Sequence, residues 1–234
     1  MDAFKVDRLL GRLGRLLLAP RCLLCGEVAG GERDLCGACA AELPWSGHAC
    51  ARCALPLHEP GTCGPCLRRP PPLAATHAAF VYGFPLDRLL PRFKFHDDLA
   101  AGRLLSQLMA DALRGLPPPD ALVPVPLHRA RLRSRGYDQA LELAKPLART
   151  LRIPLLADAL VRRRETRPQS ELDAVARQRN LRGAFEVRGN QALPGHVVLV
   201  DDVMTTGATL HAAATMLRRA GVQRVDAWVC ARVP

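Results

Sequence analysis

Apolar residues follow two different spacings over the last two thirds of the chain. Short apolar runs predict buried strands, and they cover residues 77–84, 120–126, 195–200 and 222–233. Apolar residues three or four positions apart predict amphipathic helices, and this spacing covers residues 85–98, 99–116, 137–152 and 208–221. Strands that alternate with helices indicate an α/β domain built around a parallel sheet with flanking helices.

Two features interrupt this alternation. Pro146 falls inside the helical pattern of residues 137–152 and should kink that helix or break it. Residues 160–190 are rich in arginine and have weak periodicity, so we expect a loop or an excursion from the core there.

Residues 1–20 carry a helical pattern of their own. Leucines recur there at helical spacing up to Pro20, which predicts an amphipathic helix. Arg12 and Arg15 interrupt the apolar centre that a secretory signal would need. The sequence contains no apolar run of about 18 residues, the length of a membrane-spanning helix. We therefore expect a cytoplasmic protein without a membrane span.

A run of three prolines in "RRPPPL" divides the chain. Consecutive prolines cannot enter a helix or a central strand. We place a linker at residues 69–73, with a cysteine-rich domain at residues 21–68 before it and the α/β domain at residues 74–234 after it.

Eight of the nine cysteines precede this linker, in four C-x-x-C pairs. The pairs are Cys22 with Cys25, Cys36 with Cys39, Cys50 with Cys53, and Cys63 with Cys66. Two such pairs supply the four thiolates of a tetrahedral structural zinc site. We predict two Zn²⁺ sites with sequential pairing, the first two pairs forming one site and the last two the other. Interleaved pairing stays open as the alternative.

Other uses of these cysteines fit the sequence less well. Disulfides need an oxidising compartment, to which the N-terminal segment gives no route. A dithiol redox motif does not recur four times in so short a segment. The ninth cysteine, Cys230, lies in an apolar run and is most simply a buried strand thiol.

The formal net charge is +11, and only three of the 33 basic residues are lysines. This charge fits an anionic partner, either a polynucleotide or a small phosphate. A compositional bias towards arginine explains it equally well, so charge alone does not decide the partner.

The stretch "VVLVDDVMTTGAT" points to one ligand class. Asp201 and Asp202 follow a buried strand, at the edge where parallel sheets bind ligands. Residues 205–209 then offer backbone N–H groups, hydroxyls and a glycine at the start of a helix, which suits a phosphate group. Carboxylates beside a phosphate cradle suit a sugar 5-phosphate. The alternative is that these side chains only cap a turn and a helix.

Two common phosphate motifs are excluded. A Walker loop would need Gly-Lys-Ser/Thr, and the lysine is missing. A dinucleotide fingerprint would need more glycines than this turn contains.

This stretch resembles the 5-phosphoribosyl 1-pyrophosphate (PRPP) signature of type I phosphoribosyltransferases. "DALVPVPLHRARLRSRGYDQA", "RRRETRPQSELDAVARQRNLRGAF" and the four cysteine pairs resemble segments of the ComF family of competence-associated proteins, which have an N-terminal double zinc ribbon. The resemblance covers nearly the whole chain. One departure is Asp138, which stands where the family usually has Asn.

The resemblance implies roles for individual residues. Asp201 and Asp202 would bind the ribose hydroxyls of PRPP, and the 5-phosphate would bind Thr205, Thr206, Gly207, Ala208 and Thr209. The pyrophosphate would lie near Leu127, His128, Arg129, Arg133, Arg135 and Lys94. A closing segment would contain Arg164, Thr166 and Gln169, followed by Arg177 and Asn180. Mg²⁺ would be bound mainly by oxygens of PRPP.

Two functions follow from the resemblance. One is transfer of the phosphoribosyl group from PRPP to an unknown acceptor, with release of pyrophosphate. The other is a non-catalytic PRPP-binding accessory role in DNA uptake, with contacts to single-stranded DNA or to proteins of the competence machinery. The chain has only six Phe, two Tyr and two Trp, which limits base stacking on single strands. The sequence does not predict the acceptor or the oligomeric state.

Overall fold

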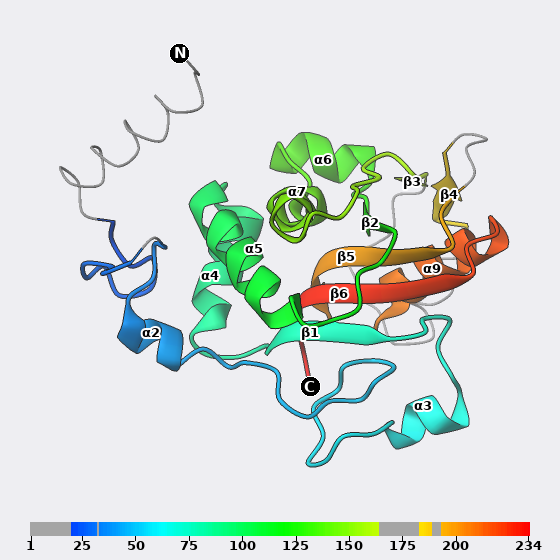
Figure 1. Ribbon diagram of the computed structural model, residues 1–234. Coiled ribbons are helices and arrows are strands. Elements are labelled where there is room, and N and C mark those ends of the chain that lie inside the picture. Colours follow the sequence, from blue (N-terminus) through cyan, green and yellow to red (C-terminus); the bar gives the residue numbers. More distant parts are fainter. Residues whose placement is uncertain (1–19, 32, 164–182, 189–192) are drawn as a thin grey trace. The chain divides into compact units, whose positions relative to one another are not determined.

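The computed structural model describes residues 20–31, 33–163, 183–188 and 193–234 (Figure 1). The chain forms two compact units, Met1–Leu43 and Pro44–Pro234, and each is described by itself. The helix predicted over residues 1–20 and most of the excursion predicted at residues 160–190 lie outside the described residues. The linker at residues 69–73 and the domain boundaries drawn from it stay a prediction.

A parallel sheet forms the centre of the larger unit, as predicted. Its strands are β1 (Thr76–Val81), β2 (Ala121–Pro124), β5 (His196–Met204) and β6 (Arg224–Arg232). They lie in the order β1-β6-β5-β2, with every neighbouring pair parallel. Residues 197–200 of β5 are all buried. Such strands need cover on both faces of the sheet.

The four predicted helices are present, and three of them provide this cover. They are α4 (Leu86–Phe95), α5 (Leu99–Leu113), α7 (Gln139–Leu151) and α9 (Ala208–Arg219). Helices α5 and α7 lie on one face of the sheet and α9 on the other (Figure 1). Leu199 shares a buried cluster with Leu210 and Leu217 of α9. Successive strand residues point to opposite faces, so Val198 and Val200 face the α5 and α7 side.

Aspartates begin two of these helices. Asp98 accepts a hydrogen bond from the N–H of Ala101 at 2.9 Å, and Asp138 accepts one from the N–H of Leu141 at 3.1 Å. Both are N-caps, which satisfy amides that the first helical turn leaves unpaired. Helix α7 includes Pro146, so the chain does not break into two helices at this residue.

Several short elements were not expected from the apolar pattern. They are α2 (Gly37–Ala41), α3 (Gly64–Arg68), α6 (Arg129–Arg135), β3 (Leu160–Arg162) and β4 (Phe185–Val187). Strands β3 and β4 pair antiparallel in a separate two-stranded sheet. Helix α6 has one leucine among polar residues, and its ends are set by His128 as N-cap and by Gly136, with φ of 75°, as C-cap. Local capping therefore defines α6, and it leaves no periodic signal.

The segment from Trp45 to Leu73 packs into the core of the larger unit. Cys50, Cys53, Cys63, Cys66 and Leu73 share the buried cluster that contains α9 and the strands. The ring of Trp45 lies 4.6 Å from that of Phe80 in β1, centre to centre. The last two cysteine pairs thus belong to the same compact unit as the parallel sheet.

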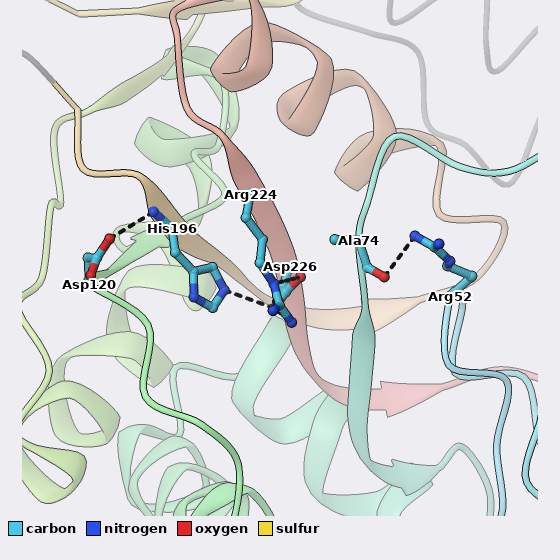
Figure 2. Close-up of polar contacts among 6 residues, drawn as sticks. All are labelled: Arg52, Ala74, Asp120, His196, Arg224 and Asp226. Carbon is cyan, nitrogen blue, oxygen red and sulfur yellow. Dashed lines mark hydrogen bonds and ion pairs between the residues drawn. The ribbon is translucent and has the colours of Figure 1, made fainter.

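A polar network joins the amino ends of β5 and β6 (Figure 2). The carboxylate of Asp226 accepts from Nε2 of His196 at 2.9 Å and pairs with Arg224 at 2.9 Å. Asp120 accepts from the N–H of His196 at 2.8 Å. Figure 2 also shows Arg52, whose Nη1 donates to the carbonyl oxygen of Ala74 at 2.9 Å. These contacts fix the sheet at its amino edge and leave the carboxyl edge to the site.

Candidate functional site

The carboxyl end of β5 carries two acidic side chains that are ordered by their own backbone. Asp201 accepts from the N–H of Asp202 at 2.9 Å, and Asp202 accepts from the N–H of Val203 at 2.6 Å. The strand continues to Met204, so both aspartates lie within β5 and not after it. Nζ of Lys94 lies 2.9 Å from Oδ2 of Asp202, which makes a largely buried ion pair.

The crowding of charge changes the protonation of this site. The pKa of Asp201 is raised to about 8, first by loss of water around its carboxyl group and then by the charge of Asp202. Burial acts to lower the pKa of Lys94, but the nearby Asp202 carboxylate outweighs burial and the pKa is raised. At neutral pH, Lys94 is therefore charged while Asp201 is mostly protonated.

The loop at residues 205–209 makes a tight turn into α9. Gly207 precedes the helix with φ of 77°, a conformation that favours glycine. A Cβ atom on Gly207 would lie 2.4 Å from Cε of Met204 and 3.1 Å from Nε2 of His211. Within the described residues no side chain caps α9. The amino end of a helix is a favourable place for an anion.

A cavity of about 340 Å³ gathers these groups with side chains from distant elements. Its acidic lining is Asp138, Asp201 and Asp202; its basic lining is Lys94, Arg131, Arg135 and Arg162; its hydroxyls are Thr205 and Thr209. Four cations against three carboxylates, one of them mostly protonated, favour an anionic ligand. The turn after "PVP" contributes Leu127.

Only some of the predicted site residues line this cavity. Seven line the cavity, namely Asp201, Asp202, Thr205, Thr209, Leu127, Lys94 and Arg135. His128 caps α6, and Arg129 lines a small separate cavity with Glu186. Arg133 lies in the last turn of α6, while Thr206 and Ala208 line a larger cavity of about 1210 Å³ on the other side of the loop. Arg164, Thr166, Gln169, Arg177 and Asn180 lie outside the described residues.

Asp138 is a cavity residue to which the sequence assigned no role. One of its carboxylate oxygens accepts from the N–H of Leu127 at 2.7 Å, while the other caps α7. Asp138 therefore holds the turn after β2 against the start of α7. Burial raises its pKa, although these backbone donors act in the opposite direction. An aspartate at the start of a helical pattern is the N-cap signal that could have found it, and it also shows that the helix begins at Gln139, two residues after the start of the predicted range.

Three more residues line the cavity, and two of them come from elements that the sequence did not reveal. Arg131 lies in α6 and Arg162 in β3, where its guanidinium lies 5.5 Å from the ring centre of Phe185. Burial lowers the pKa of Arg162. Gln139 accepts from Arg135 at 3.1 Å and fixes that side chain.

The eight N-terminal cysteines form two clusters, one in each compact unit. Cys22, Cys25, Cys36 and Cys39 make the first, and Cys50, Cys53, Cys63 and Cys66 make the second, with the sulfur atoms of each within 4.8 Å of one another. The sulfurs of Cys25 and Cys36 are 3.7 Å apart, and those of Cys53 and Cys63 are 3.6 Å apart. Tetrahedral zinc with Zn–S bonds of about 2.3 Å separates sulfurs by about 3.8 Å.

Both clusters therefore fit a structural zinc ion, and the predicted sequential pairing is confirmed. The residue after the second cysteine has positive φ in each cluster, 81° at Gly26 and 54° at Ala54. The two metal-binding turns thus share a backbone conformation.

The fold, the acidic strand end and the cysteine clusters define a phosphoribosyltransferase-type protein with a double zinc ribbon. Residues 13–67 match the double zinc ribbon domain, and residues 138–234 match the phosphoribosyl transferase domain. The chain is 36% identical over 225 residues to Competence protein F of Haemophilus influenzae, covering 91% of this chain and 96% of that protein.

Two further relatives extend this likeness. DNA utilization protein YhgH of Escherichia coli is 35% identical over 222 residues, covering 90% of this chain and 96% of the relative. Competence protein ComFC of Bacillus subtilis is 29% identical over 199 residues, covering 81% and 80%. The chain belongs to the ComF/YhgH family, as its sequence motifs indicated. No helix within the described parts of the chain is long and apolar enough to cross a membrane.

Proposed function

We propose that the cavity at the carboxyl end of β5 binds PRPP together with Mg²⁺. The observation that carries this proposal is the placement of Asp201 and Asp202 in one cavity with Thr205, Thr209 and Lys94. Carboxylates accept hydrogen bonds from ribose hydroxyls, while the loop at residues 205–209 binds the 5-phosphate through its amides and hydroxyls. Thr206, Gly207 and Ala208 contribute backbone to this loop.

The pyrophosphate group of PRPP lies towards the basic side of the cavity in this proposal. Arg131, Arg135 and Arg162 line that side, and arginine binds phosphate oxygens in a bidentate manner. Arg135 is held by Gln139 and stacks over Phe95 at 5.2 Å, so its orientation is set before the ligand arrives. Arg133, His128, Arg129 and Arg164 remain proposed contributors to the same region.

The donor set also fits Mg²⁺ carried by the ligand. Asp201 and Asp202 offer carboxylate oxygens at the cavity edge, and Mg²⁺ prefers a few carboxylates with phosphate oxygens and waters. When bound, the ion neutralises pyrophosphate charge. Arrival of a cation beside Asp201 would favour its ionised form and release the proton that its raised pKa otherwise retains at neutral pH.

We propose phosphoribosyl transfer as the reaction. The bond between C1 of the ribose and the pyrophosphate oxygen breaks, pyrophosphate leaves with the electron pair, and an acceptor nucleophile forms the new bond to C1. The arginines and Lys94 stabilise the departing charge, and the ribose is held by the two aspartates. Little general-base work is needed, so a poised base is not required.

A pyrophosphate-release screen with PRPP, Mg²⁺ and a panel of nucleobases and small amines tests the reaction. Calorimetric titration with PRPP and Mg²⁺ tests its premise. Binding that Asp202→Ala leaves unchanged would refute the proposed site, and undetectable binding would refute the function.

A second candidate is a non-catalytic role in DNA uptake or use, suggested by the names of the relatives. PRPP would then act as a bound signal, and the basic surface would contact single-stranded DNA or proteins of the competence machinery. The net charge of +11 is compatible with such an anionic partner, although charge alone does not decide between partners. Binding to a labelled single strand over a salt series tests this candidate, since phosphate contacts weaken steeply with salt. Absence of binding at low salt would remove the DNA-contact form.

A further inference from the structure

The guanidinium of Arg232 lies between the second cysteine cluster and the residue that precedes the loop at residues 205–209. Its Nε donates to the carbonyl oxygen of Cys53 at 2.9 Å, and its Nη1 donates to the carbonyl oxygen of Met204 at 3.3 Å. Nη1 also donates to the carbonyl oxygen of Val233. One side chain therefore joins a metal-binding turn to the end of β5.

The position of the Cys53 carbonyl depends on the metal-binding turn. The sulfur of Cys53 belongs to the second cluster, and the next residue, Ala54, has φ of 54°. The N–H of Ala54 donates to the carbonyl oxygen of Cys50 at 2.8 Å, which closes the turn. A non-glycine residue in this conformation persists when its surroundings hold it. Loss of the metal would release the turn and move the carbonyl that Arg232 binds.

The opposite end of this link is the entry to the loop. The carbonyl of Met204 directly precedes Thr205, which lines the proposed PRPP cavity. Thr206, by contrast, lines the cavity of about 1210 Å³ together with Cys53 and Arg232. The loop thus borders two cavities, so a contact at either end can help to order it. Arg232 supplies such a contact at the β5 end.

We infer that Arg232 is a positioning residue that links the second cysteine cluster to the loop at residues 205–209, so that metal bound at this cluster orders the loop. The residues of this link all belong to the larger unit, whereas the first cluster lies in the other compact unit. The two metal sites consequently differ in role, although their ligands are the same. The consequence for PRPP affinity rests on the proposed function; the ordering of the loop does not.

Hydrogen exchange of the full chain, measured by mass spectrometry with both metal sites loaded, tests the link. Arg232→Met is expected to speed exchange of the amides at residues 205–209 by about tenfold, which corresponds to about 1.4 kcal/mol. The matched control is Arg218→Met on the exposed surface of α9, which is expected to leave this exchange unchanged. Unchanged exchange in Arg232→Met would overturn the inference.

The role of the metal is tested by replacing one cysteine ligand in each cluster. Cys66→Ser is expected to speed exchange in the loop, and Cys39→Ser is expected not to, with metal content measured for each variant. Adding Cys66→Ser to Arg232→Met should give no further increase, because both changes break the same link. Equal acceleration by the two cysteine variants would contradict a specific role for the second cluster.

Two further measurements separate this inference from folding defects and from the proposed function. Arg232→Lys keeps the charge and can reach one carbonyl, so the exchange of its loop amides should be faster than in the wild type and slower than in Arg232→Met. It also provides the test of the link if Arg232→Met does not fold. The Kd for PRPP with Mg²⁺ should rise about tenfold in Arg232→Met. If the wild type binds no PRPP, the proposed function fails, while the exchange data still decide the role of Arg232.

Discussion

The ammonium group of Lys94 at the end of α4 forms a 2.9 Å ion pair with Asp202 in β5. The side chain of Asp202 is 9% exposed and that of Lys94 is 28% exposed, so the pair is screened little by water. Lys94 thereby neutralises a carboxylate at the entrance to the proposed ribose site. It also anchors α4 to the edge of the sheet where the cavity opens.

Replacement of Lys94 tests how much the site depends on this pair. Lys94→Met leaves Asp202 without its cation beside Asp201 and Asp138, and removing one partner of a buried pair is costly. We expect the Kd for PRPP with Mg²⁺ to rise at least about tenfold, measured by calorimetry. Lys145→Met is the control, because it breaks a more exposed pair with Glu142 on α7. An unchanged Kd in Lys94→Met would contradict the role of the pair.

The backbone of Gly207 predicts a selective effect on ligand binding. Alanine at a φ of 77° costs about 1–2 kcal/mol, and its Cβ would displace Met204 and His211. Gly207→Ala should therefore weaken PRPP binding by tenfold or more in a titration. Gly115→Ala is the matched control, since a Cβ there meets open space. Equal affinities for the two variants would show that the loop tolerates the change.

The raised pKa of Asp201 predicts how stability depends on pH. Folding raises this pKa from 3.8 to about 8, so the folded chain holds the proton more tightly than the unfolded chain. The resulting stabilisation is fully present below about pH 4 and is lost as pH rises through about 8. The asparagine variant Asp201→Asn cannot lose this proton, so the wild type should lose stability relative to it between about pH 4 and pH 8.

Urea denaturation of the wild type and of Asp201→Asn at several pH values in that window measures the difference. Both proteins should be compared without ligand and with the metal sites loaded. Parallel stability curves over the window would show that Asp201 keeps an ordinary pKa.

At the amino edge of the sheet, away from the proposed PRPP site, we expect a substitution to lower stability without weakening PRPP binding. Asp226→Asn removes the charge that pairs with Arg224 and His196, and hydrogen bonds to charged groups are worth about 1.5–3 kcal/mol. The free energy of unfolding should fall by about that amount in urea titrations, while the Kd for PRPP stays unchanged. Asp158→Asn, which breaks an exposed pair with Arg188, should change neither quantity measurably. Weaker PRPP binding in Asp226→Asn would show that the two edges are coupled.

The part of the site that the sequence predicts well is contiguous in the chain. Asp201, Asp202 and the loop at residues 205–209 follow a buried strand and precede a helix, so chain order alone brings them together. The cysteine clusters were predictable for a related reason, since the short spacing within and between pairs restricts their partners. Lys94 is predictable as a site residue only from the family resemblance, because the family commonly has a lysine at this position. The structure gives it a partner in Asp202.

The part that was not predictable depends on short elements and on tertiary contacts. Arg162 lies in a strand of three residues, and Arg131 lies in a helix with one leucine, so neither has a periodic signal. Arg232 ends an apolar strand, and its contact with Cys53 joins residues 179 positions apart. Such a contact exists only once the sheet and the second cluster have formed.

The strand order has a consequence for the synthesis of the protein. Strand β6 is made after the other three strands of its sheet, yet it lies between β1 and β5. Among the described residues, β1 pairs with no other strand of that sheet. While the ribosome is still translating the segment before residue 224, β1 and β5 lack their common neighbour. The native order of this sheet can therefore form only after β6 has been synthesised and has inserted between β1 and β5.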